Sequence, residues 1–465
     1  MYTEGLVPAS IASCCLTKGV YPNSYPYEKT AILSLFYFDS CSTVPMRTLH
    51  HFVLPSLFLL SILLWSCNRE KQWEGQEPVK KINTESVPVQ LQYKGVFDLG
   101  NGVFVTNNFE GARLNGVVRN NDTLVTVLIT PENSPINMSP WYAFKLWSET
   151  PRSLYLKLTY PENAGHRYLP KLSSDGLNWR ALDSASFQTT TMMLEEEEVV
   201  KDLTMRIPVD TDTLWISAQE LITNTHVEQW IRELESYSYV ERSSIGNSHE
   251  GRPIPLLKIG ESDDRKMIMV ISRQHPPEVP GFLAMQAFVE TLCAPTELAD
   301  DFRSRYNVYV VPMVNPDGVF HGHWRHNGGG VDLNRDWQDF NQPETSAIRD
   351  FMMQKTKGDK GKFYFSVDFH STFEDIYYTI DPKLEGNLPG LVPKLIEATG
   401  QELPGYTPNV RPNSAGEARI TSTSFLFYEM GAEALTYEIG DGTPRDFIRQ
   451  KGEVTATKLM ELLLK

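Results

Sequence analysis

Short apolar runs alternate with longer amphipathic segments over the second half of the chain, and this alternation restricts the fold more than any other feature. The apolar runs are rich in β-branched residues and have the length of buried strands, while the longer segments have a helical periodicity. The predicted strands are Pro255–Ile259, Met267–Ile271, Asn307–Val314, Lys362–Phe369 and Ala434–Ile439, and the predicted helices are Val279–Leu292, Thr345–Lys355, Leu391–Thr399 and a last helix that ends at Lys465. Strands that alternate with helices build a mixed, mostly parallel sheet with helices on both faces, so we expect an α/β fold.

The region ahead of it, residues 87–210, contains strand-like runs and turns without intervening helices. The clearest runs are Leu124–Thr130, Trp141–Trp147 and Leu154–Thr159. Such spacing predicts an antiparallel β-sandwich that precedes an α/β domain at residues 211–465. No chemical motif is visible in the sandwich, so we expect it to act as a substrate-facing wall or as a folding partner.

Residues 46–66 have the features of an export signal. Met46–His51 is a short basic start, and Phe52–Trp65 is apolar throughout. This apolar run is too short to span a membrane comfortably but has the length of a signal-peptide core. Because it ends in Ser66 and Cys67, it resembles a bacterial lipoprotein signal that is cleaved before the cysteine, which then carries lipid. An ordinary secretory signal followed by an unrelated cysteine is the alternative.

A signal peptide belongs at the N-terminus of a chain, so we expect Met46 to be the true start and residues 1–45 to be a mis-assigned extension. The polar residues 67–86 are expected to form a tether. The sequence therefore predicts an exported lipoprotein, attached to a membrane through Cys67, at the periplasmic side or the cell surface.

Composition excludes several other classes. The net charge of −15 argues against non-specific binding to nucleic acid. The five cysteines are Cys14, Cys15, Cys41, Cys67 and Cys293. They are scattered without a CxxC spacing, which argues against a zinc ribbon or a disulfide framework.

Three chemically capable residues follow predicted strands. His275-Pro-Pro-Glu278 comes after the strand Met267–Ile271, and His370 ends another strand. Imidazoles and a carboxylate suit a zinc ion, which in catalytic sites takes three protein ligands and keeps one position for water. Ligands of such sheets lie beyond the carboxyl ends of the strands, so one pocket can gather these side chains. A lone histidine at a strand end is more often structural, and that interpretation of His370 stays open here.

Other residues in this half suit proton transfer and the recognition of a substrate carboxylate. Glu438 ends an apolar strand, where loss of water would raise its pKa toward that of a general base. Arg325 and the segment Asp332–Arg335 lie in a short Gly-rich stretch. Arginine offers a planar fork to a carboxylate, so this stretch suits recognition of one.

Together these motifs resemble the zinc metallocarboxypeptidases of the carboxypeptidase A type, peptidase family M14. In the family's order the matching motifs are Gly251-Arg252, His275-x-x-Glu278, Asn315-Pro-Asp-Gly318, Trp324-Arg325, Asp332-x-Asn-Arg335, His370 and Glu438, which cover roughly residues 225–465. The strand-rich region ahead of them and the stretch Ala418–Ile420 look like the cytosolic-carboxypeptidase branch. The resemblance implies that residues 211–465 form a catalytic domain.

The resemblance implies a zinc centre with one ion per chain. His275, Glu278 and His370 would be its ligands. Asp332 would orient His275 and fix its tautomer. The substrate would be a peptide with a free C-terminal carboxylate.

The resemblance also assigns roles in hydrolysis. Zinc and Glu438 would activate a water molecule, and Arg325 would help to stabilise the oxyanion. Asn334 and Arg335 would hold the C-terminal carboxylate, which makes the activity that of an exopeptidase. Glu438 would then pass the proton to the leaving amine.

The chain departs from the family pattern in the substrate pocket. Ungapped counting back from Glu438 places Gly416 where many members carry a substrate-contacting tyrosine, so we assign no such tyrosine. The position that sets specificity falls on Thr423, which is neutral. Arg419 is the nearest cation, and we expect it to meet an acidic side chain or a second carboxylate of the substrate. A surface salt bridge is the equally weighted alternative for Arg419.

Three functions compete on these grounds. The leading one is a zinc carboxypeptidase acting on peptides outside the cytoplasm, including cell-wall peptides. A zinc amidohydrolase of small N-acyl amino acids, as in the related deacylase branch, is the second. A catalytically inactive peptide-binding module is the third, although all metal ligands and Glu438 are present.

Overall fold

The computed structural model describes residues 75–76, 79–194, 196–358, 361–413 and 418–465, which fall within one compact unit. The predicted extension 1–45, the predicted signal 46–66 and Cys67 lie outside the described residues. None of the helices in the described ranges combines the length and the apolar character that a membrane span requires.

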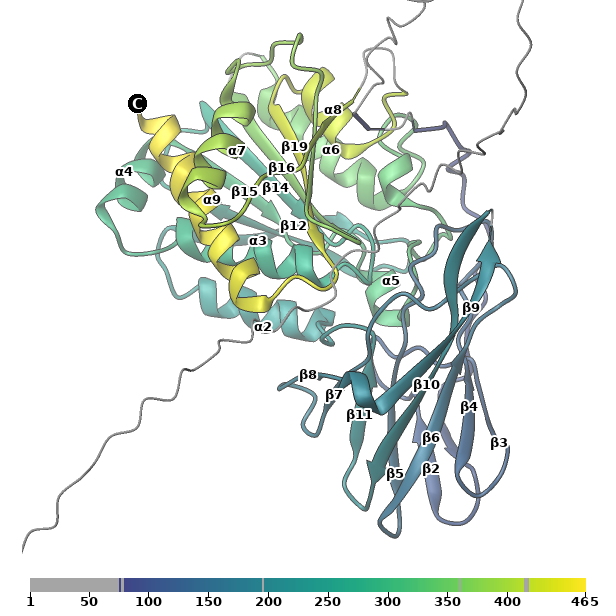
Figure 1. Ribbon diagram of the computed structural model, residues 1–465. Coiled ribbons are helices and arrows are strands. Elements are labelled where there is room, and N and C mark those ends of the chain that lie inside the picture. Colours follow the sequence, from purple (N-terminus) through teal and green to yellow (C-terminus); the bar gives the residue numbers. More distant parts are fainter. Residues whose placement is uncertain (1–74, 77–78, 195, 359–360, 414–417) are drawn as a thin grey trace, which may run out of the picture. The chain divides into compact units, whose positions relative to one another are not determined.

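The carboxy-terminal part is built on a sheet of eight strands (Figure 1). In spatial order they are β12 (Val240–Asn247), β13 (Pro253–Ile259), β15 (Asn307–Val311), β14 (Lys266–Ser272), β16 (Lys362–Thr372), β19 (Glu433–Gly440), β17 (Ile376–Thr379) and β18 (Val410–Pro412). The central strands β15, β14, β16 and β19 are parallel, and β13 and β17 join them in antiparallel pairs. The expected mixed sheet is confirmed.

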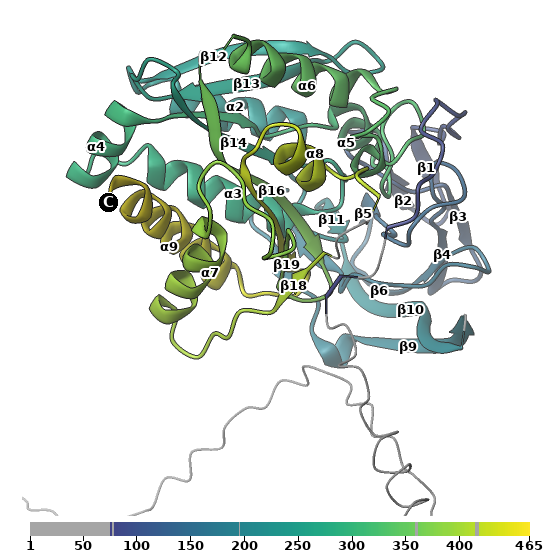
Figure 2. The same cartoon turned by 90° about the horizontal axis from the view of Figure 1, so that it is seen from above.

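Helices cover both faces of this sheet, as Figures 1 and 2 show. One core, on the face with α3, includes residues of α2 (Asn224–Leu234), α3 (Val279–Leu292), α4 (Glu297–Arg305), α7 (Leu391–Glu402) and α9 (Arg445–Leu464). A second core, on the other face, includes residues of α6 (Pro343–Thr356) and α8 (Ser422–Tyr428). The short helix α5 (Pro316–His321) follows β15 along the chain. Strands covered on both faces read as continuous apolar runs, which is why they were predictable.

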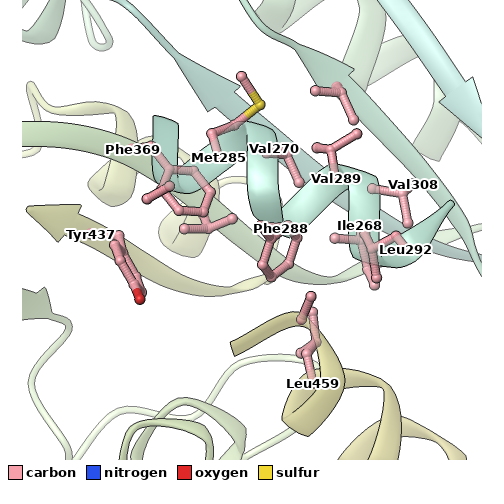
Figure 3. Close-up of a cluster of buried hydrophobic side chains, with 14 of the residues drawn as sticks. Ile268, Val270, Met285, Phe288, Val289, Leu292, Val308, Phe369, Tyr437 and Leu459 are labelled. Atoms are coloured by element: carbon pink, nitrogen blue, oxygen red, sulfur yellow. The ribbon is translucent and has the colours of Figure 1, made fainter. Parts of the chain in front are cut away.

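The side chains of strand β14 pack alternately into the two cores. Ile268 and Val270 pack with Phe288 of α3 in the first core, where Figure 3 also shows Phe369 and Tyr437. The intervening residues of β14 face the second core. Burying one such side chain stabilises the fold by about 1.5–3 kcal/mol. The strand is thereby fixed, and so is the turn that follows it.

The amino-terminal part is a β-sandwich of two sheets. The first contains β1 (Val96–Asp98), β2 (Val103–Thr106), β5 (Ala143–Ser148), β11 (Leu214–Ser217), β7 (Lys171–Ser173) and β8 (Arg180–Ala181), and the second contains β3 (Gly116–Arg119), β4 (Leu124–Leu128), β6 (Arg152–Thr159), β10 (Glu197–Val209) and β9 (Phe187–Leu194). On β6, Leu154, Leu156 and Leu158 are buried while Tyr155 is exposed, and the predicted strand Leu154–Thr159 is confirmed. The pairing is antiparallel, as expected, except that β4 runs parallel to β6.

Two predicted boundaries differ from the structure. Strand β11 pairs with β5, so the sandwich continues to Ser217, past the predicted limit at 210. Its Ile216 is buried in the sandwich core, which explains why the strand belongs there. The described end of the predicted tether is also packed, because Thr84 is buried and hydrogen-bonds Asn341 and Gln342.

Candidate metal centre and cavity

Two histidines from distant segments converge on one carboxylate. His275 and Glu278 lie in the turn between β14 and α3, and Glu278 is the N-cap residue of α3. His275 Nδ1 lies 2.8 Å from Glu278 Oε1, and Nδ1 of His370, on β16, lies 2.7 Å from Glu278 Oε2. The two imidazole rings are 5.0 Å apart. The turn and the strand therefore bring these three side chains together.

A second carboxylate lies behind each histidine. His275 Nε2 is 3.0 Å from Asp332 Oδ1, and His370 Nε2 is 2.7 Å from Asp368 Oδ2. Because the Nε2 atoms are held in this way, both Nδ1 atoms face Glu278. Carboxylates that bind the outer nitrogen are usual behind metal-bound histidines, where they fix the tautomer and the ring orientation.

The donor set fits a zinc ion. The candidate ligand atoms of His275, Glu278 and His370 lie within 4.8 Å of one another, and all three residues are buried. Two imidazole nitrogens and one carboxylate make a typical catalytic zinc site with an open position for water. The negative charge of the surrounding carboxylates suits a divalent cation.

Glu438 lies beside this group. It is the register partner of His370 in the neighbouring parallel strand, β19, and both line the same cavity. Its Oε2 atom is buried and has no hydrogen-bond partner among the described residues. Burial raises the pKa of Glu438 above its usual range; His370 opposes the shift, while Glu278 and Asp368 add to it. The surroundings of this carboxyl therefore favour its neutral, protonated form.

Asp332 links the metal centre to a guanidinium. Arg325 Nε donates to Asp332 Oδ2 at 2.7 Å, while Oδ1 of the same carboxylate faces His275. Although burial alone would raise the pKa of Asp332, the charges of Arg325, Arg335 and His275 hold it well below its usual range. Asp332 thus stays ionised and keeps Arg325 and His275 in a fixed relation.

Asn334 and Arg335 follow directly in a short 3-10 turn, Leu333–Arg335. The backbone amide of Asn334 donates to Asp332 Oδ1, and its side-chain oxygen accepts from the amide of Ser422. Both residues line the cavity, whose volume is about 740 Å³. The structure therefore brings them to the same space as the metal centre.

The cavity gathers most of the residues singled out in the sequence. It is lined by His275, Glu278, His370, Glu438, Arg325, Asn334, Arg335 and Thr423, among others. Arg419 is not among the lining residues; it is exposed and stacks on the ring of Tyr428 at 3.7 Å. Gly416 lies outside the described residues, and Tyr378 of β17 is a tyrosine that lines the cavity.

The sandwich contributes a buried carboxylate to this site. Glu132 accepts hydrogen bonds from the backbone amides of Trp324, Arg325 and His326 at 2.7, 3.0 and 2.7 Å. Burial opposes its ionisation, but nearby His323, Arg113 and His326 and the hydrogen bond from the His326 amide lower the pKa of Glu132 to about 2. Its charge therefore holds the backbone that carries Arg325.

The roles of Glu132 and Asp368 in the site were not predicted from the sequence. Glu132 lies in a polar turn and carries no local signal of its role. Asp368 did carry one, because it stands two residues before His370 on one strand, and such residues share a face.

Comparisons with known proteins agree with this geometry. The family model "Peptidase_M14: Zinc carboxypeptidase" matches residues 227–462. "Cytosolic carboxypeptidase 6" of Caenorhabditis elegans is 31% identical over 159 residues, which cover 32% of this chain and 35% of that protein. "Inactive metallocarboxypeptidase ecm14" of Talaromyces marneffei is 28% identical over 234 residues, covering 37% of this chain and 38% of that protein. The chain thus spans little more than a third of the length of these two relatives.

A solved structure supports the fold. The metallo-carboxypeptidase from Burkholderia cenocepacia superposes with a TM-score of 0.64 at 18% identity. The match covers 78% of this chain and 98% of that one. At this identity the likeness shows a shared fold.

Proposed function

Because the chain belongs to the zinc carboxypeptidase family Peptidase_M14, we propose that it hydrolyses the last peptide bond of peptides with a free C-terminal carboxylate. The observation that carries the proposal is the convergence, in one cavity, of three candidate zinc-ligand side chains, the partly buried carboxylate of Glu438 and three basic or amide groups. A general acid–base, an oxyanion partner and a carboxylate clamp are what this reaction requires.

His275, Glu278 and His370 would hold one zinc ion per chain. Bound zinc would supply Lewis acidity, which polarises a peptide carbonyl and lowers the pKa of water. Asp332 and Asp368 keep the two imidazoles oriented from behind. The carboxylates therefore preserve the ligand geometry through each cycle.

Glu438 is the proposed proton carrier. It takes a proton from the attacking water and gives it to the departing amine, and its register next to His370 supports this role. Arg325 donates a hydrogen bond to the oxygen that becomes negative as the carbonyl is attacked. Its backbone, fixed by Glu132, and its side chain, fixed by Asp332, hold that donor ready.

Asn334 and Arg335 are the proposed clamp for the substrate's terminal carboxylate. A guanidinium fork pairs with a carboxylate in a planar, two-bond arrangement. Asn334 is held in place by its backbone N–H, which donates to Asp332, and by its side-chain oxygen, which accepts from the amide of Ser422. A chain end bound here presents its last peptide bond to the metal centre, so the proposed activity removes one residue at a time.

The proposal extends to the location of the protein. Residues 46–66 would direct export, Cys67 would carry a lipid that attaches the chain to a membrane, and residues 1–45 would be absent from the mature protein. The residues that follow the sandwich, from 218 to 465, would form the catalytic domain. Mass spectrometry of the mature protein tests this: an N-terminal lipid-modified Cys67 supports it, and a chain that retains residues 1–45 contradicts it.

A product profile tests the activity. The purified protein is incubated with a panel of peptides and with a panel of N-acyl amino acids, with and without a chelator. Release of single C-terminal amino acids that stops with the chelator supports the proposal. Hydrolysis of the acyl amino acids alone would instead favour the deacylase alternative, and zinc binding without any turnover would favour a binding module.

A further inference from the structure

One wall of the cavity carries a guanidinium from the β-sandwich. Arg167 lies in the segment between β6 and β7, yet it lines the cavity with Glu278 and Glu438. Its side chain is only 10% exposed. The proposed roles of the family residues leave this cation without an assignment.

The strand ends that carry the active centre hold Arg167 in place. Its Nε donates to Oδ2 of Asp441, which follows β19, at 2.8 Å, and its guanidinium carbon lies 4.4 Å from the ring centre of Phe373, which follows β16. Nη1 donates to the carbonyl of Met138 at 3.2 Å and to Oγ of Ser139 at 3.1 Å. The side chain is therefore held on several sides next to the strands of His370 and Glu438.

One nitrogen of this guanidinium has no acceptor. Nη2 is buried and makes no hydrogen bond to any described residue. A buried donor without a partner is unfavourable, so such atoms in native structures call for an explanation such as a ligand. The position of Arg167 in the cavity wall makes substrate the ligand to consider.

We propose that Arg167 is a substrate-binding residue whose Nη2 donates a hydrogen bond to a main-chain carbonyl oxygen on the amino side of the cleaved bond. The inference rests on the proposed function. With the terminal carboxylate held by Asn334 and Arg335, the rest of the peptide must leave the metal centre along another wall of the cavity. The wall with Arg167 offers it a rigid donor.

A carbonyl oxygen suits this donor better than an acidic side chain does. The charge of Arg167 is already paired with Asp441, and its other donors are used by Met138 and Ser139. What remains is one nitrogen, Nη2, which can donate to a carbonyl oxygen but cannot form a two-nitrogen fork with a carboxylate. Arg167 therefore selects for peptide length and leaves the identity of the side chains open.

The test compares substrates of increasing length that share their last residues. Peptides of two, three and four residues with a free amino group are assayed, because the shortest then has no carbonyl beyond that of the cleaved bond. The ratio of kcat/KM for the longest to kcat/KM for the shortest is measured. In the wild-type protein the ratio is well above one. In Arg167→Met and in Arg167→Lys, which withdraws Nη2 but keeps a charge beside Asp441, it falls roughly 10- to 100-fold, as expected for a hydrogen bond from a charged donor.

Arg445→Met is the matched control. Arg445 forms a bidentate ion pair with Glu220 and does not line the cavity. Its loss removes a partly exposed ion pair outside the cavity, so the length ratio stays at the wild-type value. Zinc content and thermal unfolding are measured for each variant.

Two results overturn the inference: Arg167→Lys keeping the wild-type ratio, or Arg445→Met losing it to the same extent. Either would leave the proposed function standing if the wild-type protein still shortens peptides. Failure of the wild-type protein to shorten any peptide would overturn the proposed function itself.

Discussion

His370 and Glu438 are register partners in adjacent parallel strands, β16 and β19. Register partners of parallel strands project from the same face of the sheet, so the pairing of the strands places the proposed metal ligand and the proposed proton carrier side by side. The relative position of His370 and Glu438 depends on the pairing of the two strands and not on the conformation of a loop. Substitution of one side chain is therefore expected to change the chemistry and leave the other in place.

Glu438→Gln is expected to abolish turnover and to retain zinc. Glutamine has nearly the same shape but cannot accept a proton, and general acid–base catalysis is worth about 10²- to 10⁴-fold in rate. The measurements are kcat on a peptide substrate and zinc content by mass spectrometry. A variant that keeps kcat within a few-fold of the wild-type value would remove Glu438 from the mechanism.

Asp332→Asn is expected to weaken zinc binding about 10- to 100-fold, the usual cost of losing a carboxylate behind a metal-bound histidine. It also removes the partner of Arg325, so kcat falls in the zinc-saturated protein. Competition with a chelator of known affinity measures the first effect. Asp339→Asn, which alters only a partly exposed pair with Lys81, is the control and should bind zinc as the wild type does.

Glu132→Ala is expected to destabilise the fold by about 2–4 kcal/mol, because three backbone amides lose their buried acceptor. The segment with Arg325 would lose its support, so kcat is expected to fall more than KM changes. Urea unfolding and steady-state kinetics measure both effects. Glu162→Gln, at an exposed position of the sandwich, is the control, and equal behaviour of the two variants would contradict this role of Glu132.

Glu344 lies away from the metal centre, and its raised pKa predicts that the stability of the fold depends on pH. Burial raises the pKa of Glu344 from 4.5 to about 7, although hydrogen bonds from the amide of His249 and from Asn327 oppose the shift. The folded state therefore binds more protons than the unfolded state between these values. Its contribution to stability is complete below pH 4.5 and is lost as the pH rises through 7.

Glu344→Gln should remove this dependence. The difference in unfolding free energy between wild type and variant should change by about 2–3 kcal/mol between pH 4.5 and pH 8, with the wild type relatively weaker at the higher pH. Urea unfolding at both pH values measures it. A constant difference would show that the carboxyl titrates normally.

The central strands were predictable because their burial on both faces leaves a continuous apolar signal in the sequence. The strand β18 and the helix α8 were not predicted. Strand β18 has three residues, and α8 begins with Ser422, Thr423 and Ser424, whose helical state depends on burial against the sheet. Tertiary contacts, and not local propensity, determine whether such short elements form.

The same division applies to the site. His275, Glu278, His370 and Glu438 stand at the ends of predicted strands, so their convergence was expected and the structure agrees. Glu132 lies about 190 residues from the amides that it binds. Contacts between residues so distant leave no local pattern, which is why the sandwich was expected only as a wall or a folding partner.

The central claim is that three distant segments bind a single zinc ion. Diffraction from crystals of the zinc-loaded protein, measured on both sides of the zinc absorption edge, tests it directly. The account predicts one anomalous peak per chain, about 2.0–2.2 Å from Nδ1 of His275, Nδ1 of His370 and the carboxylate of Glu278. A peak elsewhere, or none at these side chains in zinc-saturated crystals, would contradict it.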